Sequence, residues 1–215
     1  MILKKGSKGN EVRQLQQLLH LYVDGIFGEL TEEAVKEYQR THGLLADGIV
    51  GDKTWAKLNN SSLKKSNRSI NEIIVHCSAT KEGQDFTVAD ITKWHKQRGF
   101  TTIGYHYVIY RDGSLHEGRN INVSGAHCTG HNTHSIGICY IGGLSANGKC
   151  KDTRTEKQKK ALLNLLTNLR KLYPKAKIIG HRDTSPDKNG NGIIEPKEWV
   201  KECPSFDAKT EYKKV

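Results

Sequence analysis

Three side chains of the kinds that bind zinc stand at strand ends or in a loop of this sequence. His76 ends the apolar run 73–75, His181 comes just after the run 177–179, and Cys203 lies in a later loop. Two imidazoles and one thiolate leave a fourth coordination position open, which is the pattern of a catalytic zinc site. Zinc held there would polarise a carbonyl and lower the pKa of a bound water to about 7. Taken singly, each residue also fits a structural role, because a free cysteine often packs as a small apolar side chain.

The segments around these residues predict the strands that would position them. The runs 73–75, 136–141 and 177–179 are apolar and short, as in buried strands. Asp112-Gly113 separates two further strand-like segments and is a strong signal for a β-hairpin.

Two helices are predicted between the strands. Thr87 and Asp90 form a capping-box pattern, and Gly99 is placed to end that helix. The segment 155–172 carries leucines at helical spacing, and Pro174 follows its end. We therefore expect residues 70–215 to form an α/β domain, a mixed sheet flanked by helices.

The first part of the chain predicts a separate, small all-α domain of three helices over residues 1–58. An internal repeat links its parts, since Asp24-Gly25-Ile26-Phe27-Gly28 recurs as Asp47-Gly48-Ile49-Val50-Gly51. Asp-Gly pairs favour tight turns. The polar segment 59–69 lacks apolar periodicity and is predicted to be a linker.

The charge balance restricts the partners. The net charge is +11, from 34 basic and 23 acidic residues, and such a chain favours polyanions. Nucleic acid and the anionic bacterial envelope both fit, but there is no dense run of Lys or Arg with interleaved aromatics, so we expect no nucleic-acid binding. The five cysteines are odd in number and irregularly spaced, which argues against a disulfide framework. They form no CxxC pair, which argues against a four-cysteine zinc site.

Membrane signals are absent from the sequence. No apolar run of about 18 residues predicts a membrane-spanning helix, and residues 1–6 lack the apolar stretch of a signal peptide. We expect synthesis in the cytoplasm, no membrane insertion and a monomer.

Several segments of residues 1–58 carry a family resemblance. They are Gly6-Ser7-Lys8-Gly9-Asn10-Glu11-Val12, Leu15-Gln16, the two Asp-Gly-Ile-x-Gly turns, Ala34-Val35-x-x-Tyr38-Gln39 and Thr54-Trp55. Together they resemble the three-helix peptidoglycan-binding domain. This resemblance, rather than the periodicity, implies binding to bacterial peptidoglycan.

A second resemblance spans about residues 70–208. Its segments are Val75-His76-Cys77-Ser78-Ala79-Thr80-Lys81, Trp94-His95-Lys96, Gly104-Tyr105-His106-Tyr107, Arg111-Asp112-Gly113, Glu117-Gly118-Arg119, His127-x-x-Gly130-x-Asn132, Ser135-Ile136-Gly137 and Cys203-Pro204-Ser205-Phe206-Asp207. They resemble the type 2 N-acetylmuramoyl-L-alanine amidases, which include phage lysozyme-like amidases and peptidoglycan recognition proteins.

The amidase resemblance implies roles for individual residues. It makes His76, His181 and Cys203 the zinc ligands, and it gives Tyr105 and Lys201 the positions of the catalytic tyrosine and lysine. Zinc and the lysine ammonium would stabilise the oxyanion formed by attack on an amide, and the tyrosine would orient the water or move a proton.

The resemblance places three more residues beside the substrate groove. His127 is expected to contact substrate, with Asn132 and Ser135 shaping the pocket. A purely structural role for His127 remains the alternative.

The segment between His181 and Cys203 departs from the compact phage pattern. Residues 187–198 fit the twelve-residue EF-hand loop, whose ligand positions are Asp187, Asn189, Asn191, Ile193 (through its carbonyl) and Glu198. This predicts a bound Ca²⁺ that would brace the insertion. No EF-hand helix precedes the loop, and a turn-rich insertion without a metal is the alternative.

The combined interpretation is a zinc-dependent amidase that cuts the bond between N-acetylmuramic acid and L-alanine. A wall anchor joined to an amidase suits a phage endolysin, which reaches the wall through a membrane pore; a bacterial autolysin is the nearest rival. The alternative class is a non-catalytic peptidoglycan recognition protein. Such proteins commonly lack the zinc cysteine, whereas Cys203 is present here.

Overall fold

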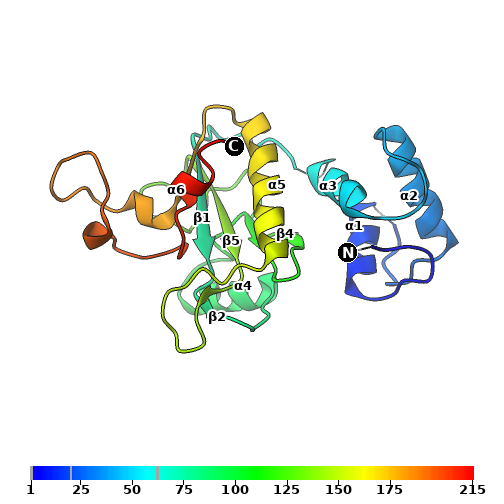
Figure 1. Ribbon diagram of the computed structural model, residues 1–215, viewed down its shortest axis with the longest axis horizontal. Coiled ribbons are helices and arrows are strands. Elements are labelled where there is room, and N and C mark those ends of the chain that lie inside the picture. The colour runs from blue at the N-terminus through cyan, green and yellow to red at the C-terminus, as the bar shows by residue number, and fades with distance from the viewer. Residues whose placement is uncertain (1, 20, 62) are drawn as a thin grey trace. The chain divides into compact units, whose positions relative to one another are not determined.

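The computed structural model describes residues 2–19, 21–61 and 63–215, and the chain forms two compact units, 1–64 and 65–215. The first unit holds three helices, α1 (Asn10–Leu18), α2 (Glu29–Thr41) and α3 (Asp52–Ser61), shown in blue to cyan in Figure 1. Its core is a cluster of seven buried apolar residues: Leu3, Val12, Leu15, Phe27, Val35, Val50 and Leu58.

The internal repeat of this unit consists of two equivalent turns, each held by a buried glutamine. Gln16 donates from Nε2 to the carboxylate of Asp24 (2.7 Å) and accepts the Gly25 N–H at its Oε1 (2.9 Å). In the second turn, Gln39 makes the same two bonds, to Asp47 (3.0 Å) and from Gly48 (2.9 Å). Buried polar groups need such partners, so each glutamine fixes the turn that its helix packs against.

The second unit is built on a five-stranded mixed sheet with the order β4-β3-β5-β1-β7. Its strands are β1 (Glu72–Cys77), β3 (Tyr107–Ile109), β4 (Leu115–Glu117), β5 (Ser135–Tyr140) and β7 (Lys177–Gly180). All neighbouring pairs are parallel except the β3–β4 hairpin. A separate small sheet is formed by two parallel strands, β2 (Thr80–Lys81) and β6 (Gly143–Leu144). In the chain, β2 follows β1 and β6 follows β5. The central strands β1 and β5 are buried almost throughout, as expected for strands covered on both faces.

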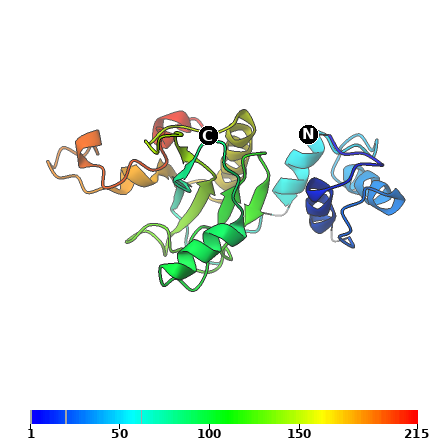
Figure 2. The same cartoon turned by 90° about the horizontal axis from the view of Figure 1, so that it is seen from below.

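Two helices cover the sheet from opposite sides, α4 (Val88–Gln97) and α5 (Glu156–Leu172) (Figures 1 and 2). Both begin with a capping box, at Thr87 and at Thr155. On the α4 side, Ile91 packs in a cluster with Ile103, Val108 and Ile141. The helices and mixed sheet predicted from the sequence are thus present.

The predicted linker 59–69 is more ordered than its composition suggests. Helix α3 continues to Ser61, and Ser66 is buried, with its Oγ donating to the carbonyl of Ile121 (2.8 Å). Arg68 donates to the carbonyls of Ile121 and Ser135 (2.9 and 3.2 Å). The sequence could not indicate these bonds because their acceptors lie more than fifty residues away.

The chain ends with an extended segment and short helical turns. After the 3₁₀ turn η1 (His181–Thr184), an insertion projects away from the sheet (orange in Figure 1) and includes η2 (Pro196–Glu198). The chain then returns to helix α6 (Ala208–Glu211), which packs beside β7. Among the described residues, none of the helices has the length and apolar character needed to cross a membrane.

Candidate active site

Strand register brings two histidines together at one edge of the sheet. Strands β1 and β7 are parallel, and Val75 is paired with Gly180. The next residue in each segment is a histidine, His76 within β1 and His181 directly after β7, so the two emerge side by side. Their Nδ1 atoms lie 3.1 Å apart, although the sequence separates them by 105 residues.

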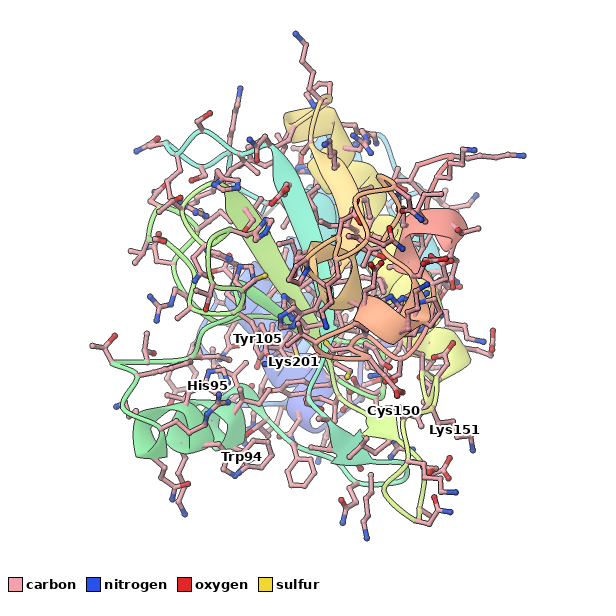
Figure 3. All side chains as sticks on the ribbon, turned by 90° about the vertical axis from the view of Figure 1, so that its left-hand side faces the viewer. Trp94, His95, Tyr105, Cys150, Lys151 and Lys201 are labelled. Atoms are coloured by element: carbon pink, nitrogen blue, oxygen red, sulfur yellow. The ribbon has the colours of Figure 1, made fainter. Side chains whose placement is uncertain are left out.

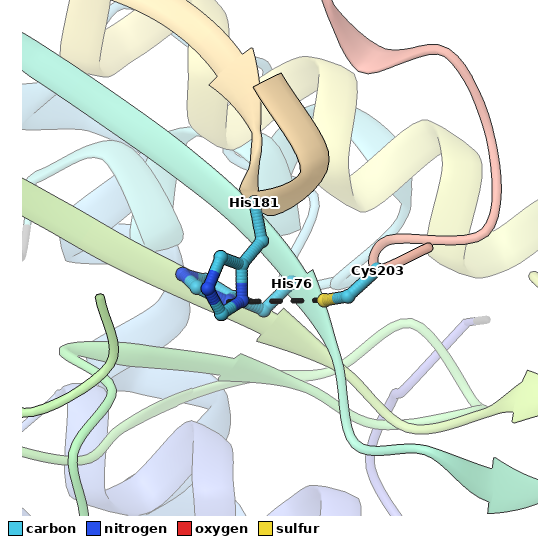
Figure 4. Close-up of side chains that lie close together, drawn as sticks. All are labelled: His76, His181 and Cys203. Carbon is cyan, nitrogen blue, oxygen red and sulfur yellow. Dashed lines mark hydrogen bonds between the residues drawn. The ribbon is translucent and has the colours of Figure 1, made fainter. Parts of the chain in front are cut away.

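The chain returns from the insertion to place Cys203 against the same pair (Figure 4). Cys203 Sγ lies 3.8 Å from His76 Nδ1 and accepts the backbone N–H of Cys77 at 3.3 Å. The Cys203 carbonyl accepts the N–H of Arg182 at 2.7 Å. A Cβ on Gly180 would stand only 2.6 Å from Pro204 Cδ, so the close approach of this loop to β7 requires a glycine.

The three side chains fit a zinc ion by their chemistry. Their ligand atoms all lie within 4.8 Å of one another, and they form the mixed nitrogen and sulfur set that zinc prefers. The Nδ1 atoms of His76 and His181 face each other, and a cation bound by both would relieve the repulsion between their lone pairs. Interaction with Cys77 and burial raise the pKa of the Cys203 thiol, so metal binding would have to release its proton.

His76 also contacts a fourth residue through its other ring nitrogen. Its Nε2 lies 3.0 Å from Nδ1 of His127, and the Nε2 of His127 lies 3.4 Å from the Ser135 hydroxyl. Burial, together with the neighbouring His127 and His181, holds the pKa of His76 well below its usual value. A neutral His76 that donates from Nε2 presents a bare Nδ1 lone pair to the metal position, as zinc-ligating histidines do.

Tyr105 lies next to this cluster, with its ring centroid 5.1 Å from that of His76. Burial raises its pKa well above the usual tyrosine value, so the phenol keeps its proton and can act as a donor. Its backbone carbonyl accepts the N–H of Arg119 (2.8 Å), while the preceding Gly104 donates to Nδ1 of His95 (2.9 Å). These bonds fix the loop that carries Tyr105 into β3.

Lys201 brings a positive charge to the cluster from the chain segment just before Cys203. Its charge lowers the pKa of both His76 and His181, although burial is the larger cause for each. For His181 the resulting pKa is about 4. Figure 3 labels both Lys201 and Tyr105, near the carboxyl ends of the central strands. A cation here can stabilise negative charge that develops on a bound carbonyl.

The residues expected beside the substrate groove form one hydrogen-bonded loop. The Asn132 side-chain oxygen accepts the N–H groups of His127 (2.8 Å) and Cys128 (2.9 Å). Ser135 is fully buried beneath His127, so its hydroxyl reaches the site only through that imidazole. These contacts hold the loop that carries His127. A pocket shaped by Asn132 and Ser135, and contact of His127 with substrate, stay predictions.

Two residues that support the site were not indicated by the sequence. Arg68, within the predicted linker, donates from Nη1 to the carbonyls of Asn132 and Thr133 (both 3.2 Å) and so holds the His127 loop. His106 accepts the Gly137 N–H at Nδ1 (3.0 Å) and is buried beside it. His106 lies within the motif 104–107, but no local pattern indicates either role because the hydrogen-bond partners come from other elements.

The predicted calcium loop has its acidic side chains occupied by backbone donors. Asp187 accepts the N–H groups of Gly190 and Gly192, both at 2.7 Å. Glu198, which is buried, accepts those of Lys188 (2.9 Å) and Glu195 (2.9 Å). These hydrogen bonds hold the loop together without a metal, which is consistent with the alternative of a metal-free insertion. Calcium binding by Asp187, Asn189, Asn191, Ile193 and Glu198 stays a prediction.

Comparison with known proteins assigns both units to families. Residues 66–196 match the N-acetylmuramoyl-L-alanine amidase family, and residues 8–58 match a peptidoglycan binding domain family. The endolysin of Enterobacteria phage K11 is 40% identical over 136 residues, which cover 63% of this chain and 81% of the phage protein.

Solved structures with a similar fold include amidases and recognition proteins. The N-acetylmuramoyl-L-alanine amidase LysC from Clostridium intestinale has 28% identity and a TM-score of 0.52, over 68% of this chain and 83% of LysC. Drosophila PGRP-LB has 26% identity and a TM-score of 0.52, over 71% of this chain and 85% of its own.

Proposed function

Because this chain belongs to the N-acetylmuramoyl-L-alanine amidase family, we propose that it hydrolyses the amide bond between N-acetylmuramic acid and L-alanine in bacterial peptidoglycan, using zinc held by His76, His181 and Cys203. The observation that carries the proposal is the convergence of these three ligand atoms within 4.8 Å at one edge of the sheet. The donor set leaves a coordination position open for water or substrate.

The chemistry divides between the metal and the surrounding side chains. A zinc ion bound there would supply Lewis acidity toward the scissile carbonyl and an activated water. Tyr105, whose pKa burial raises, holds a proton that it can donate in a hydrogen bond to the reacting groups. The ammonium of Lys201 stabilises the negative charge of the tetrahedral oxyanion. His127 keeps the imidazole of His76 in the tautomer and orientation that a ligand needs.

The first unit serves as a wall anchor in this proposal. Residues 8–58 match a peptidoglycan binding domain family, and the net charge of +11 suits an anionic envelope. The relative from phage K11 is an endolysin. We extend that role to this chain, which would act on the bacterial wall after release through a membrane pore and cause lysis.

The alternative function is peptidoglycan recognition without cleavage, because the solved structures with a similar fold include a complex of peptidoglycan recognition proteins with bound tracheal cytotoxin. The presence of the thiol of Cys203 beside both histidines, with Tyr105 in contact with His76, favours the enzyme.

Product analysis tests the proposal. Purified peptidoglycan is digested with the zinc-loaded protein, and the soluble products are identified by mass spectrometry. We expect free stem peptides that begin with L-alanine, together with glycan chains that have lost their peptides. Intact glycan–peptide after binding would support recognition instead, and products cut within the glycan or within the stem would contradict the amidase assignment.

A further inference from the structure

A second cluster of metal-binding side chains lies outside the proposed zinc site. Glu72, at the start of β1, meets His131 and His134, which precede β5. The Nδ1 of His131 lies 2.7 Å from Glu72 Oε2, and the Nε2 of His134 lies 3.4 Å from the same oxygen. All three ligand atoms lie within 4.8 Å of one another. The cluster shares no residue with the set His76, His181 and Cys203.

The backbone around this cluster is fixed before any ligand arrives. Glu72 is paired with Ser135 in the parallel register of β1 and β5. The carbonyl of His134 accepts the N–H groups of Asn71 (3.0 Å) and Glu72 (3.3 Å). Arg68 holds the carbonyl of Thr133 at 3.2 Å. A metal bound here would therefore require small side-chain movements and no rearrangement of the loop.

The spacing of the donor atoms suits a cation between them. Ligands about 2.1 Å from a tetrahedral ion stand about 3.4 Å apart, since zinc–nitrogen and zinc–oxygen bonds are about 2.0–2.2 Å. The His134–Glu72 distance is already 3.4 Å, and the His131–Glu72 distance of 2.7 Å must lengthen by several tenths of an ångström. Two imidazoles with one carboxylate form a set that suits zinc and the neighbouring divalent transition metals.

We propose that Glu72, His131 and His134 form a second binding site for a divalent transition-metal ion, zinc foremost. The three side chains keep partial solvent exposure, with relative exposed areas of 16%, 29% and 35%. The ion can therefore enter from solvent and keep a water in its open coordination position. This inference does not depend on the amidase activity.

The consequence of binding is to brace the loop that supports His76. The backbone N–H of His131 donates to the carbonyl of Cys128 at 3.1 Å. The side-chain oxygen of Asn132 accepts the backbone N–H groups of His127 and Cys128. An ion that fixes His131 and His134 to β1 thus ties down the loop from His127 onward. The second site is a positioning element rather than part of the chemistry.

Metal counting on the full-length, tag-free protein tests this site, since a histidine tag would bind the same ions. Metal-free protein is equilibrated with Zn²⁺ or Ni²⁺ by dialysis, and bound metal is counted by mass spectrometry and titrated calorimetrically. We expect two zinc equivalents for the wild type and one for Glu72→Gln or His134→Ala. Glu117→Gln, which removes an exposed carboxylate elsewhere, is the matched control and should keep both.

The Cys203→Ala background isolates the second site. The equivalent that remains in Cys203→Ala must disappear when Glu72→Gln is added, while the far-ultraviolet spectrum stays that of the folded chain. The proposal is overturned if the wild type binds only one zinc equivalent and Glu72→Gln still binds it. Glu72, His131 and His134 would then interact with one another without a metal. A residual equivalent in Cys203→Ala that Glu72→Gln does not remove would also overturn the proposal. Both readouts are independent of peptidoglycan cleavage.

Discussion

The Nε2 atom of His76 lies 3.0 Å from Nδ1 of His127, while Nδ1 of the same His76 ring faces His181 and Cys203. The two nitrogens of one fully buried imidazole thus have different tasks. One contacts a partner that fixes the ring, and the other remains for a metal. This relationship gives His127 a role that substrate contact alone does not describe.

Replacing His127 should therefore weaken the metal site. We expect His127→Ala to lower zinc affinity by about 10–100-fold, the usual cost of removing a partner that orients a ligand. His127→Asn places an amide oxygen near the position of Nδ1 and should restore part of the affinity. Competition with a fluorescent zinc chelator measures the change. Unchanged zinc affinity with a raised KM would instead assign His127 to substrate contact.

Tyr105 should affect turnover without affecting the metal. The Tyr105→Phe variant keeps the ring beside His76 but removes the proton that burial holds on the phenol by raising its pKa. We expect kcat to fall by about 10²–10⁴-fold, as for loss of a general acid or base, with zinc content unchanged. Rates of muropeptide release and metal analysis of the same sample check both parts. A variant with wild-type kcat would remove Tyr105 from the mechanism.

The metal-free protein should lose stability in acid partly through His106. Burial lowers the pKa of His106 from 6.5 to about 4, and its Nδ1 must stay unprotonated to accept the Gly137 N–H. The unfolded chain binds this proton below about pH 6.5, whereas the folded chain does not until about pH 4. The contribution of the neutral His106 to the free energy of unfolding is therefore complete above pH 6.5 and is lost as the pH falls toward 4.

Urea unfolding across this pH range measures that contribution. From the size of the shift we expect His106 to account for on the order of 3 kcal/mol of the acid destabilisation. His106→Gln, which does not titrate, should show a correspondingly flatter dependence of unfolding free energy on pH. Parallel curves for the two proteins would mean that His106 is not the group responsible.

More of the fold than of the site could be predicted from the sequence. Local signals such as the capping box at Thr87 and the repeated Asp-Gly turns specify elements through neighbouring residues. The convergence of His76 with His181 depends instead on the register of β1 and β7, which no local pattern encodes. Family resemblance indicated the ligand set, but the support from Arg68 and the cluster around Glu72 required the folded chain.

The N-terminal unit should matter more on intact walls than on small substrates. A tethered anchor raises the effective concentration of substrate near the catalytic unit. Removal of residues 1–64, the whole first unit, should therefore reduce lysis of intact walls while leaving hydrolysis of soluble muropeptides nearly unchanged. Turbidity loss and peptide release, measured on the same preparation, compare the two. An equal loss on both substrates would argue against an anchor.

The central claim is that His76, His181 and Cys203 hold the ion on which amide hydrolysis depends. The most direct test measures zinc content and the rate of L-alanyl peptide release together, in wild type, Cys203→Ala and Cys150→Ala; Cys150 is an exposed cysteine that serves as the control. We predict that only Cys203→Ala loses zinc from this site and that its release rate falls to background. Peptide release at the wild-type rate from Cys203→Ala without its zinc would contradict the account.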